Sequence, residues 1–266
     1  DQKIKDDVQF SYDRVRKFAE HQLKHFNNNF EVELSPGLFA GQKLIPVNTV
    51  GCYVPGGRNN YIASAVMSIT TAKVAGVKTV IAASPPKDQD GANPIIVYTA
   101  NLCGADIIMN LGGVAAIGAF AYGCFGNPEV DMIVGPGNQY VAEAKRILFG
   151  KIGIDLIAGP TEIAIIADKT ADKEIVASDL VGQAEHGPNS PAWLFTNNQE
   201  LCDFVLKRVP ELIADLPEHS RNNAGAAWRD YGEVILCNTN EELCQISDQY
   251  ASEHLEVQAE NLNWWM

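Results

Sequence analysis

Two residue types that can bind a metal stand three positions apart at the end of a predicted helix. They are Gln183 and His186, followed at once by Gly187-Pro188. Residues spaced i and i+3 share one face of a helix, so the amide oxygen and the imidazole can reach one point. Neutral histidine is a common ligand of zinc, whereas a glutamine oxygen is a rare one. The pair leaves two interpretations open: half of a metal site, or a hydrogen-bonded histidine beside a helix end.

A carboxylate and an imidazole are adjacent in a second pair, Glu253 and His254, directly before a short apolar run. A histidine can act as a general base when its pKa lies near the working pH, and a nearby carboxylate or metal can tune that pKa. Adjacent polar residues at the edge of a strand are also often simply solvated. The residue types fit catalysis, and the two pairs together predict a metal-assisted enzyme with a histidine base.

Composition excludes several classes of partner. The chain has 266 residues, of which 46% are hydrophobic and 20% charged, as in a globular protein with a substantial core. Its 33 acidic and 20 basic residues give a net charge of -13. A face that binds phosphate backbones needs a basic surplus, so neither nucleic acid nor an anionic membrane is an expected partner.

The cysteines and the ends of the chain carry further expectations. Six cysteines lie apart, without C-x-x-C spacing, and are interpreted as small apolar residues in a reducing compartment. No apolar run approaches ~20 residues and no signal peptide opens the sequence, so a cytoplasmic protein is expected. The start at Asp1 and the end at Trp264-Trp265-Met266 predict a piece of a longer chain.

Apolar periodicity predicts an α/β protein. Amphipathic spacing indicates one or two helices over residues 1–29, and short β-rich runs then alternate with helical segments. Strands are predicted at 51–54, 79–83, 106–109, 131–134, 163–167, 192–196, 233–237 and 255–257, and later helices at 62–75, 94–103, 114–122, 139–149, 173–185, 199–213 and 241–249. Such alternation predicts parallel sheets covered on both faces. With a break at Ala158-Gly159-Pro160, the prediction is two doubly wound, incomplete Rossmann-like parallel-sheet domains and an N-terminal helical segment.

Glycine-rich loops follow three of the predicted strands. Ligands of open α/β sheets lie beyond the carboxyl ends of the strands, where backbone N–H groups at a helix start can face a phosphate. The loops are 53–57, 111–113 and 135–139, and their glycines can equally serve only as tight turns. There is no G-x-G-x-x-G, so the usual dinucleotide fingerprint is absent.

Several strings together resemble the histidinol dehydrogenase family over nearly the whole chain. They are Val134-Gly135-Pro136-Gly137-Asn138, Glu143-Ala144-Lys145-Arg146, Ile154-Asp155, Ala158-Gly159-Pro160-Thr161-Glu162, Ala177-Ser178-Asp179-Leu180, Gln183-Ala184-Glu185-His186-Gly187 and Glu253-His254-Leu255-Glu256. Their order and spacing make the resemblance specific. The segments 226–236 and 253–265 look closer to the branch that oxidises sulfopropanediol than to the branch that makes histidine.

The resemblance implies a zinc-requiring, NAD-dependent alcohol dehydrogenase that forms a carboxylate in two oxidation steps. Gln183 and His186 match two zinc ligands that also contact the substrate, and His254 matches the general base, which contacts the substrate as well. Glu253 matches the carboxylate that activates water for the second oxidation. Three further matches concern binding: Tyr53 and Asn138 match NAD contacts, and Thr161 replaces a serine that contacts substrate.

The resemblance also implies an organisation and a departure from the family. Residues 1–44 would be the helical segment, 45–160 the NAD-side domain and 161–266 the zinc and catalytic domain, truncated at its C-terminus; the complete protein would be a homodimer acting on a small-molecule alcohol. Ala115 stands where the family often has a glutamine that contacts the cofactor. The other two zinc ligands, an Asp and a His, would lie beyond Met266, so this chain is expected to bind zinc weakly and to be inactive by itself.

Two other classes of protein stay open. A non-catalytic α/β homologue would keep the scaffold without turnover, and a zinc-independent oxidoreductase would keep activity without the metal. The substrate is open as well, because an imidazole can ligate zinc whereas a sulfonate needs Arg, Lys or helix N-terminal donors. Arg58 is a candidate anion contact, with a surface position as the alternative.

Overall fold

The short apolar runs form two parallel sheets, one in each of two compact units of the chain, and the helical segments pack against these sheets. The computed structural model describes residues 2–26, 30–56, 61–157 and 161–266. Unit 1 comprises Asp1–Gly159 and unit 2 comprises Pro160–Met266. The α/β prediction of two doubly wound parallel sheets is confirmed. The predicted break at residues 158–160, Gly57 and Arg58 lie outside the described residues.

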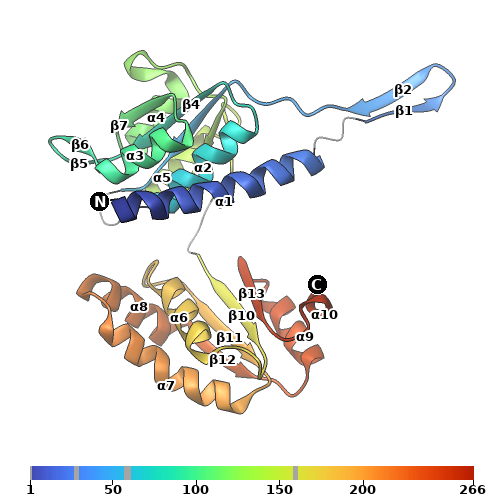
Figure 1. Cartoon of the computed structure of the whole chain (residues 1–266), viewed down its shortest axis with the longest axis vertical. Helices are drawn as coiled ribbons and strands as arrows, with labels where there is room; N and C mark the ends of the chain where they lie inside the picture. The colour runs from blue at the N-terminus through green and yellow to red at the C-terminus, as the bar shows by residue number, and fades with distance from the viewer. Residues whose placement is uncertain (1, 27–29, 57–60, 158–160) are drawn as a thin grey trace. The chain divides into compact units, whose positions relative to one another are not determined.

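The sheet of unit 1 has five parallel strands in the order β7-β4-β3-β8-β9. Figure 1 labels β7 and β4 of this sheet. Their bounds are β3 Thr49–Tyr53, β4 Thr79–Ser84, β7 Ile107–Asn110, β8 Met132–Val134 and β9 Gly153–Ile154. If these five strands are numbered in chain order, their order across the sheet is 3-2-1-4-5. This order occurs in dinucleotide-binding folds, which bind the ligand in a crevice at the point where the strand order reverses. That point lies between β3 and β8, and it brings the loops after these two strands together.

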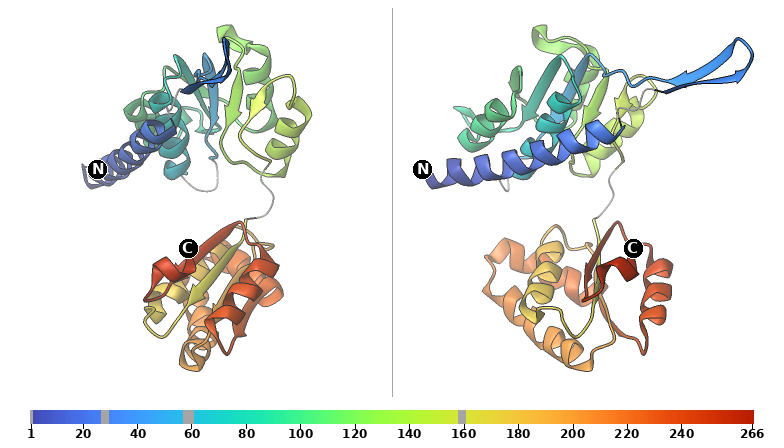
Figure 2. Two further views of the ribbon diagram at one scale, coloured as in Figure 1. Left: turned by 90° about the vertical axis from the view of Figure 1, so that its right-hand side faces the viewer. Right: turned by 45° about the vertical axis from the view of Figure 1, so that its right-hand side comes forward.

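Helices cover both faces of this sheet (Figure 2). On one face lie α1 (Gln2–Phe26), α2 (Ile62–Val74) and α3 (Pro94–Cys103); on the other lie α4 (Gly113–Tyr122) and α5 (Gln139–Leu148). The strands are therefore buried from two sides, which explains why they are apolar runs without alternation. The first predicted helical segment is a single helix, and α1 packs along α2.

The sheet of unit 2 repeats this winding in the order β12-β11-β10-β13, all parallel. The strands are β10 Ile163–Ala167, β11 Ala192–Thr196, β12 Gly232–Leu236 and β13 His254–Gln258. One face is covered by α6 (Lys173–Ala184), α7 (Gln199–Asp215) and α8 (Glu218–Tyr231), and the other by α9 (Asn240–Tyr250) with Trp265 of α10 (Leu262–Trp265). If these four strands are numbered in chain order, their order across the sheet is 3-2-1-4.

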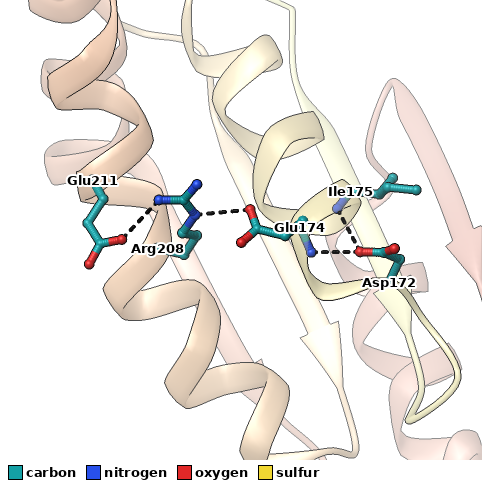
Figure 3. Close-up of polar contacts among 5 residues, drawn as sticks. All are labelled: Asp172, Glu174, Ile175, Arg208 and Glu211. Carbon is teal, nitrogen blue, oxygen red and sulfur yellow. Dashed lines mark hydrogen bonds and ion pairs between the residues drawn. The ribbon is translucent and has the colours of Figure 1, made fainter.

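Helix α6 is anchored at its start, which matters because its other end carries Gln183. The carboxylate of Asp172 accepts hydrogen bonds from the backbone N–H groups of Glu174 (2.9 Å) and Ile175 (3.4 Å), as an N-cap does (Figure 3). Arg208 of α7 then bridges Glu174 and Glu211, each at 3.0 Å. These exposed ion pairs add little free energy by themselves, but they fix α6 against α7.

Some elements were not predicted. Residues 30–44 contain an antiparallel hairpin, β1 (Phe30–Ser35) with β2 (Leu38–Gln42), whose residues are all exposed. A second small hairpin joins β5 (Pro86–Asp88) to β6 (Gly91–Ala92), and a 3-10 turn covers Cys124–Gly126. Helix α8 was also missed. Its sequence is polar, and it buries only Ala224 and Ala227 where it packs against α6 and α7, so it carries no clear apolar periodicity.

Four of the six cysteines are buried and Cys124 is exposed. Among the described helices, none is long and apolar enough to cross a membrane.

Candidate functional site

The predicted catalytic residues of unit 2 meet at the amino ends of β10 and β13. In the parallel register Ile163 pairs with His254, so Thr161 and Glu162 precede β10 where Glu253 precedes β13. Helix α6 follows β10 and returns antiparallel to it, which brings Gln183 to the same edge. The structure therefore places Thr161, Gln183, Glu253 and His254 at one edge of the sheet.

The imidazole of His254 is oriented by the backbone that precedes β10. Its Nδ1 lies 3.1 Å from the carbonyl oxygen of Glu162, and the carboxylate of Glu253 lies 3.6 Å from the same nitrogen. A carbonyl oxygen can only accept, so this contact requires the tautomer with a proton on Nδ1. Nε2 is then the basic nitrogen. Glu162 holds the pair from a second side, because its side chain accepts a hydrogen bond from the backbone N–H of Glu253 at 3.2 Å.

Gln183 is held by Thr161, whose hydroxyl accepts a hydrogen bond from the side-chain nitrogen of Gln183 at 2.9 Å. With its nitrogen engaged, the amide presents its oxygen as the remaining acceptor, the atom that a metal would bind. His186 departs from the prediction. Helix α6 ends at Ala184, and His186 lies in the following turn, where its backbone N–H donates to the carbonyl oxygen of Gln183 at 3.1 Å. Its exposed side chain is thus placed by a turn and not by a shared helix face.

Zinc needs more donors than this cluster provides. A structural or catalytic zinc site uses at least three protein ligands in a tetrahedral arrangement, and Gln183 with His186 would supply two. Within the described ranges 2–26, 30–56, 61–157 and 161–266, no group of three or more His, Cys, Asp and Glu residues could hold a metal ion. The residues present fit part of a zinc shell and do not complete one.

Two carboxyl groups lie near His254 in the fold. Glu256 is two residues further along β13, on the same face, and Asp179 lies on α6. Gln258 donates from its side-chain nitrogen to Glu256 at 2.7 Å and to Asp179 at 3.2 Å. Burial, followed by the negative charge of Asp179, raises the pKa of the Glu256 carboxyl. The cluster ties α6 to β13 and so couples the element that carries Gln183 to the one that carries His254.

This raised pKa predicts a pH-dependent contribution to stability. A carboxyl with a raised pKa binds its proton more tightly in the folded state, so its contribution is most favourable at low pH and declines as pH rises from about 4.3, the unfolded value for Glu, through the folded pKa. Glu256→Gln removes that decline. We expect the variant to unfold at a higher temperature than wild type at pH 7, with the difference shrinking towards pH 4. Melts followed by tryptophan fluorescence test this, and a difference that grows as pH falls would contradict it.

In unit 1 the predicted cofactor residues lie at the carboxyl ends of the strands. Tyr53 ends β3 and is buried, with 4% of its surface exposed, and its hydroxyl accepts a hydrogen bond from the backbone N–H of Gly113 at 3.0 Å. Asn138 caps α5: its side-chain oxygen accepts from the N–H groups of Tyr140 (3.0 Å) and Val141 (3.1 Å). Tyr53 therefore supports the loop before α4, and Asn138 leaves its exposed side-chain nitrogen for a ligand.

The candidate residues of the two units lie at opposite edges of their sheets. Tyr53 and Asn138 lie at the carboxyl ends of strands, where the sequence interpretation expected ligands, whereas the candidate residues of unit 2 lie at the amino ends of β10 and β13. In unit 2 the carboxyl ends of β10 and β13 are joined by Asp168, whose side chain accepts hydrogen bonds from Thr170 N (2.7 Å), Thr170 Oγ1 (2.6 Å) and Glu260 N (3.0 Å).

Sequence reasoning assigned no role to Glu162, to the Asp179 and Glu256 pair, or to Lys145 and Asp155. All five lie within the strings that carry the family resemblance. One signal was available for Lys145: it follows Val141 and Ala144 on the apolar side of a predicted helix, where a charge requires a partner.

Comparison with known proteins decides the family. The family model described as histidinol dehydrogenase matches residues 1–266. The chain belongs to the histidinol dehydrogenase family. It is 74% identical over 265 residues to a histidinol dehydrogenase homolog of Pelagibacter ubique and 57% identical over 265 residues to the sulfopropanediol 3-dehydrogenase of Ruegeria pomeroyi, and both matches cover 100% of this chain. These relatives are longer: the chain spans 62% and 61% of their lengths.

A solved structure of the histidinol dehydrogenase family has the same fold. The histidinol dehydrogenase of Elizabethkingia anophelis matches 100% of this chain and 60% of its own chain, with a TM-score of 0.91 and 33% sequence identity. The α/β architecture and the family resemblance predicted from sequence are thereby confirmed. The roles of the individual site residues stay predictions.

Proposed function

We propose that this chain is part of an NAD-dependent dehydrogenase that oxidises a primary alcohol through an aldehyde to a carboxylate. Family membership supports the reaction type, and the contact between His254 and Glu162 supports the catalytic assignment. That contact carries the proposal because it engages Nδ1 of His254 and leaves Nε2, at an exposed edge, as the ring nitrogen that can face a substrate hydroxyl. Tyr53 and Asn138 would serve the cofactor at the carboxyl edge of unit 1.

In this mechanism Nε2 of His254 would accept the proton of the substrate hydroxyl. Bound NAD would supply the hydride acceptor, with one NAD consumed in each of the two oxidations. The Glu253 carboxylate would take a proton from the water that adds to the aldehyde between them. Glu162 orients the ring of His254 through its carbonyl oxygen and holds the backbone of Glu253 through its carboxylate.

Zinc is part of the proposal through Gln183 and His186. A zinc ion bound there would hold the substrate and its reacting hydroxyl. The hydrogen bond from Gln183 to Thr161 supports this, because it engages the side-chain nitrogen of Gln183 and leaves the amide oxygen to bind the metal. The remaining ligands would lie in the part of the longer family members that this chain does not span. We also propose that the full-length protein is a homodimer.

The substrate is proposed at the level of a small primary alcohol, either L-histidinol or sulfopropanediol. The identity of 57% to a sulfopropanediol 3-dehydrogenase favours the second. A non-catalytic homologue is the competing function, and the incomplete donor set in the described part of the chain is the observation in its favour.

The test uses a protein in which this chain is continued to the length of its relatives. With Zn²⁺ and NAD⁺ supplied, we expect two NADH per molecule of one of the two alcohols, measured by absorbance together with the carboxylate product. A chelator should abolish the activity, and added Zn²⁺ should restore it. The absence of NADH with both alcohols would contradict the dehydrogenase assignment, and full activity after complete zinc removal would contradict the metal assignment.

A further inference from the structure

Lys145 places a charge in the interior of unit 1. The residue lies on α5 and is 3% exposed, which is rare for a lysine because a buried charge is costly unless it is paired. Its ammonium group forms an ion pair with Asp155 and donates a hydrogen bond to the carbonyl oxygen of Gly135 at 3.0 Å. Nothing in the proposed mechanism uses this lysine.

Asp155 completes a clamp on the same glycine. Its second carboxylate oxygen accepts a hydrogen bond from the backbone N–H of Gly135 at 2.7 Å. Its own N–H donates to the carbonyl oxygen of Ile133 at 3.1 Å, which extends the ladder between β8 and β9 and fixes Asp155 to the sheet. One ion pair therefore binds both the N–H and the C=O of Gly135. We call Lys145, Asp155 and Gly135 the loop clamp.

The loop clamp lies at one end of the segment that carries Asn138. Gly135 begins the loop between β8 and α5, and Asn138 ends it by capping the helix. Between these fixed points, Pro136 has no N–H, and the N–H groups of Gly137, Asn138 and Gln139 have no hydrogen-bond partner in the part of the chain that the structure describes. A loop fixed at both ends with successive free donors is preorganised for an anionic or polar ligand.

We propose that Lys145 and Asp155 are positioning residues for the dinucleotide cofactor. They act through Gly135, holding the loop so that Asn138 and the neighbouring N–H groups keep their binding geometry before NAD arrives. The proposal rests on the proposed function, because it takes this loop as a cofactor contact. This role differs from a direct contact with the cofactor, because Lys145 is buried and its ammonium group is engaged by Asp155 and by the carbonyl oxygen of Gly135.

The experiment compares NAD⁺ binding, by titration calorimetry, in three variants of the full-length protein described above. Lys145→Met and Asp155→Asn each break the ion pair and leave one charge without its partner. The double variant removes both charges and so relieves the buried unpaired charge. We expect each variant to bind NAD⁺ at least tenfold more weakly, with thermal stability lower in the single variants and largely recovered in the double variant. Lys151→Met is the matched control, since that lysine pairs with exposed Glu129 at the opposite edge of the sheet.

The double variant separates positioning from mere charge burial. If it regains both stability and wild-type affinity, the clamp has no role in binding and the proposal is overturned. Weak binding in a stable double variant, with faster exchange of the Gly135 amide that Asp155 holds, supports it. Failure of wild type to bind NAD⁺ would instead overturn the cofactor assignment itself, and with it the role of the clamp.

Discussion

Replacement of His254 by Asn is expected to lower kcat by roughly 10²- to 10⁴-fold, the usual contribution of a general base. The side-chain nitrogen of Asn can still donate to the Glu162 carbonyl, so the local contact survives while the basic Nε2 is lost. The loss should therefore fall on proton removal and leave folding and NAD⁺ binding close to wild type. The measurement is the initial rate of NADH formation with the alcohol, beside the melting temperature and the NAD⁺ dissociation constant.

A matched control for this variant lies in the same unit. His219 is exposed on α8, and the polar contact of its ring is with the side-chain nitrogen of Asn223 at 3.4 Å. His219→Asn should leave kcat within twofold of wild type. Near-normal turnover in His254→Asn, or an equal loss in both variants, would show that His254 is not the base.

The sheets were predictable from the sequence because they are buried on both faces. Burial on both faces leaves runs such as Thr79–Ser84 and Ile163–Ala167, which are continuous, apolar and bounded by turn residues. Helix α8 and the hairpin from β1 to β2 carry no comparable signal. The polar sequence of α8 buries only Ala224 and Ala227, and every residue of the hairpin is exposed.

The site was predictable in residue type and only partly in position. The pairing of β10 with β13 is a contact between segments about 90 residues apart, and no local pattern specifies it. For this reason Glu253 and His254 were identified while the role of Glu162 was missed. The end of α6 at Ala184 shows the same limit: the i, i+3 spacing of Gln183 and His186 indicated a shared helix face, but the helix stops between them.

A second variant with a large expected effect is Gly135→Ala, which should destabilise unit 1 by about 3–5 kcal/mol. Gly135 has φ +113°, a conformation that L-residues rarely adopt, and an added Cβ would lie 2.2 Å from the carbonyl oxygen of Tyr53. Neither group can move away easily. The loop clamp holds Gly135, and Tyr53 belongs to the central strand β3.

Gly150→Ala separates the steric clash from the backbone strain. Gly150 also has a positive φ, +100°, but an added Cβ there would meet nothing within 4 Å. It should cost only about 1–2 kcal/mol, the cost of the conformation alone. Urea unfolding followed by far-UV circular dichroism measures both variants, and tryptophan fluorescence reports unit 2 separately because all four tryptophans lie there. Equal losses in the two variants would mean that the Tyr53 carbonyl yields to the methyl group. A larger loss for Gly135→Ala, confined to the signal of unit 1, would show that the loop between β8 and α5 is packed against β3 as tightly as the structure indicates.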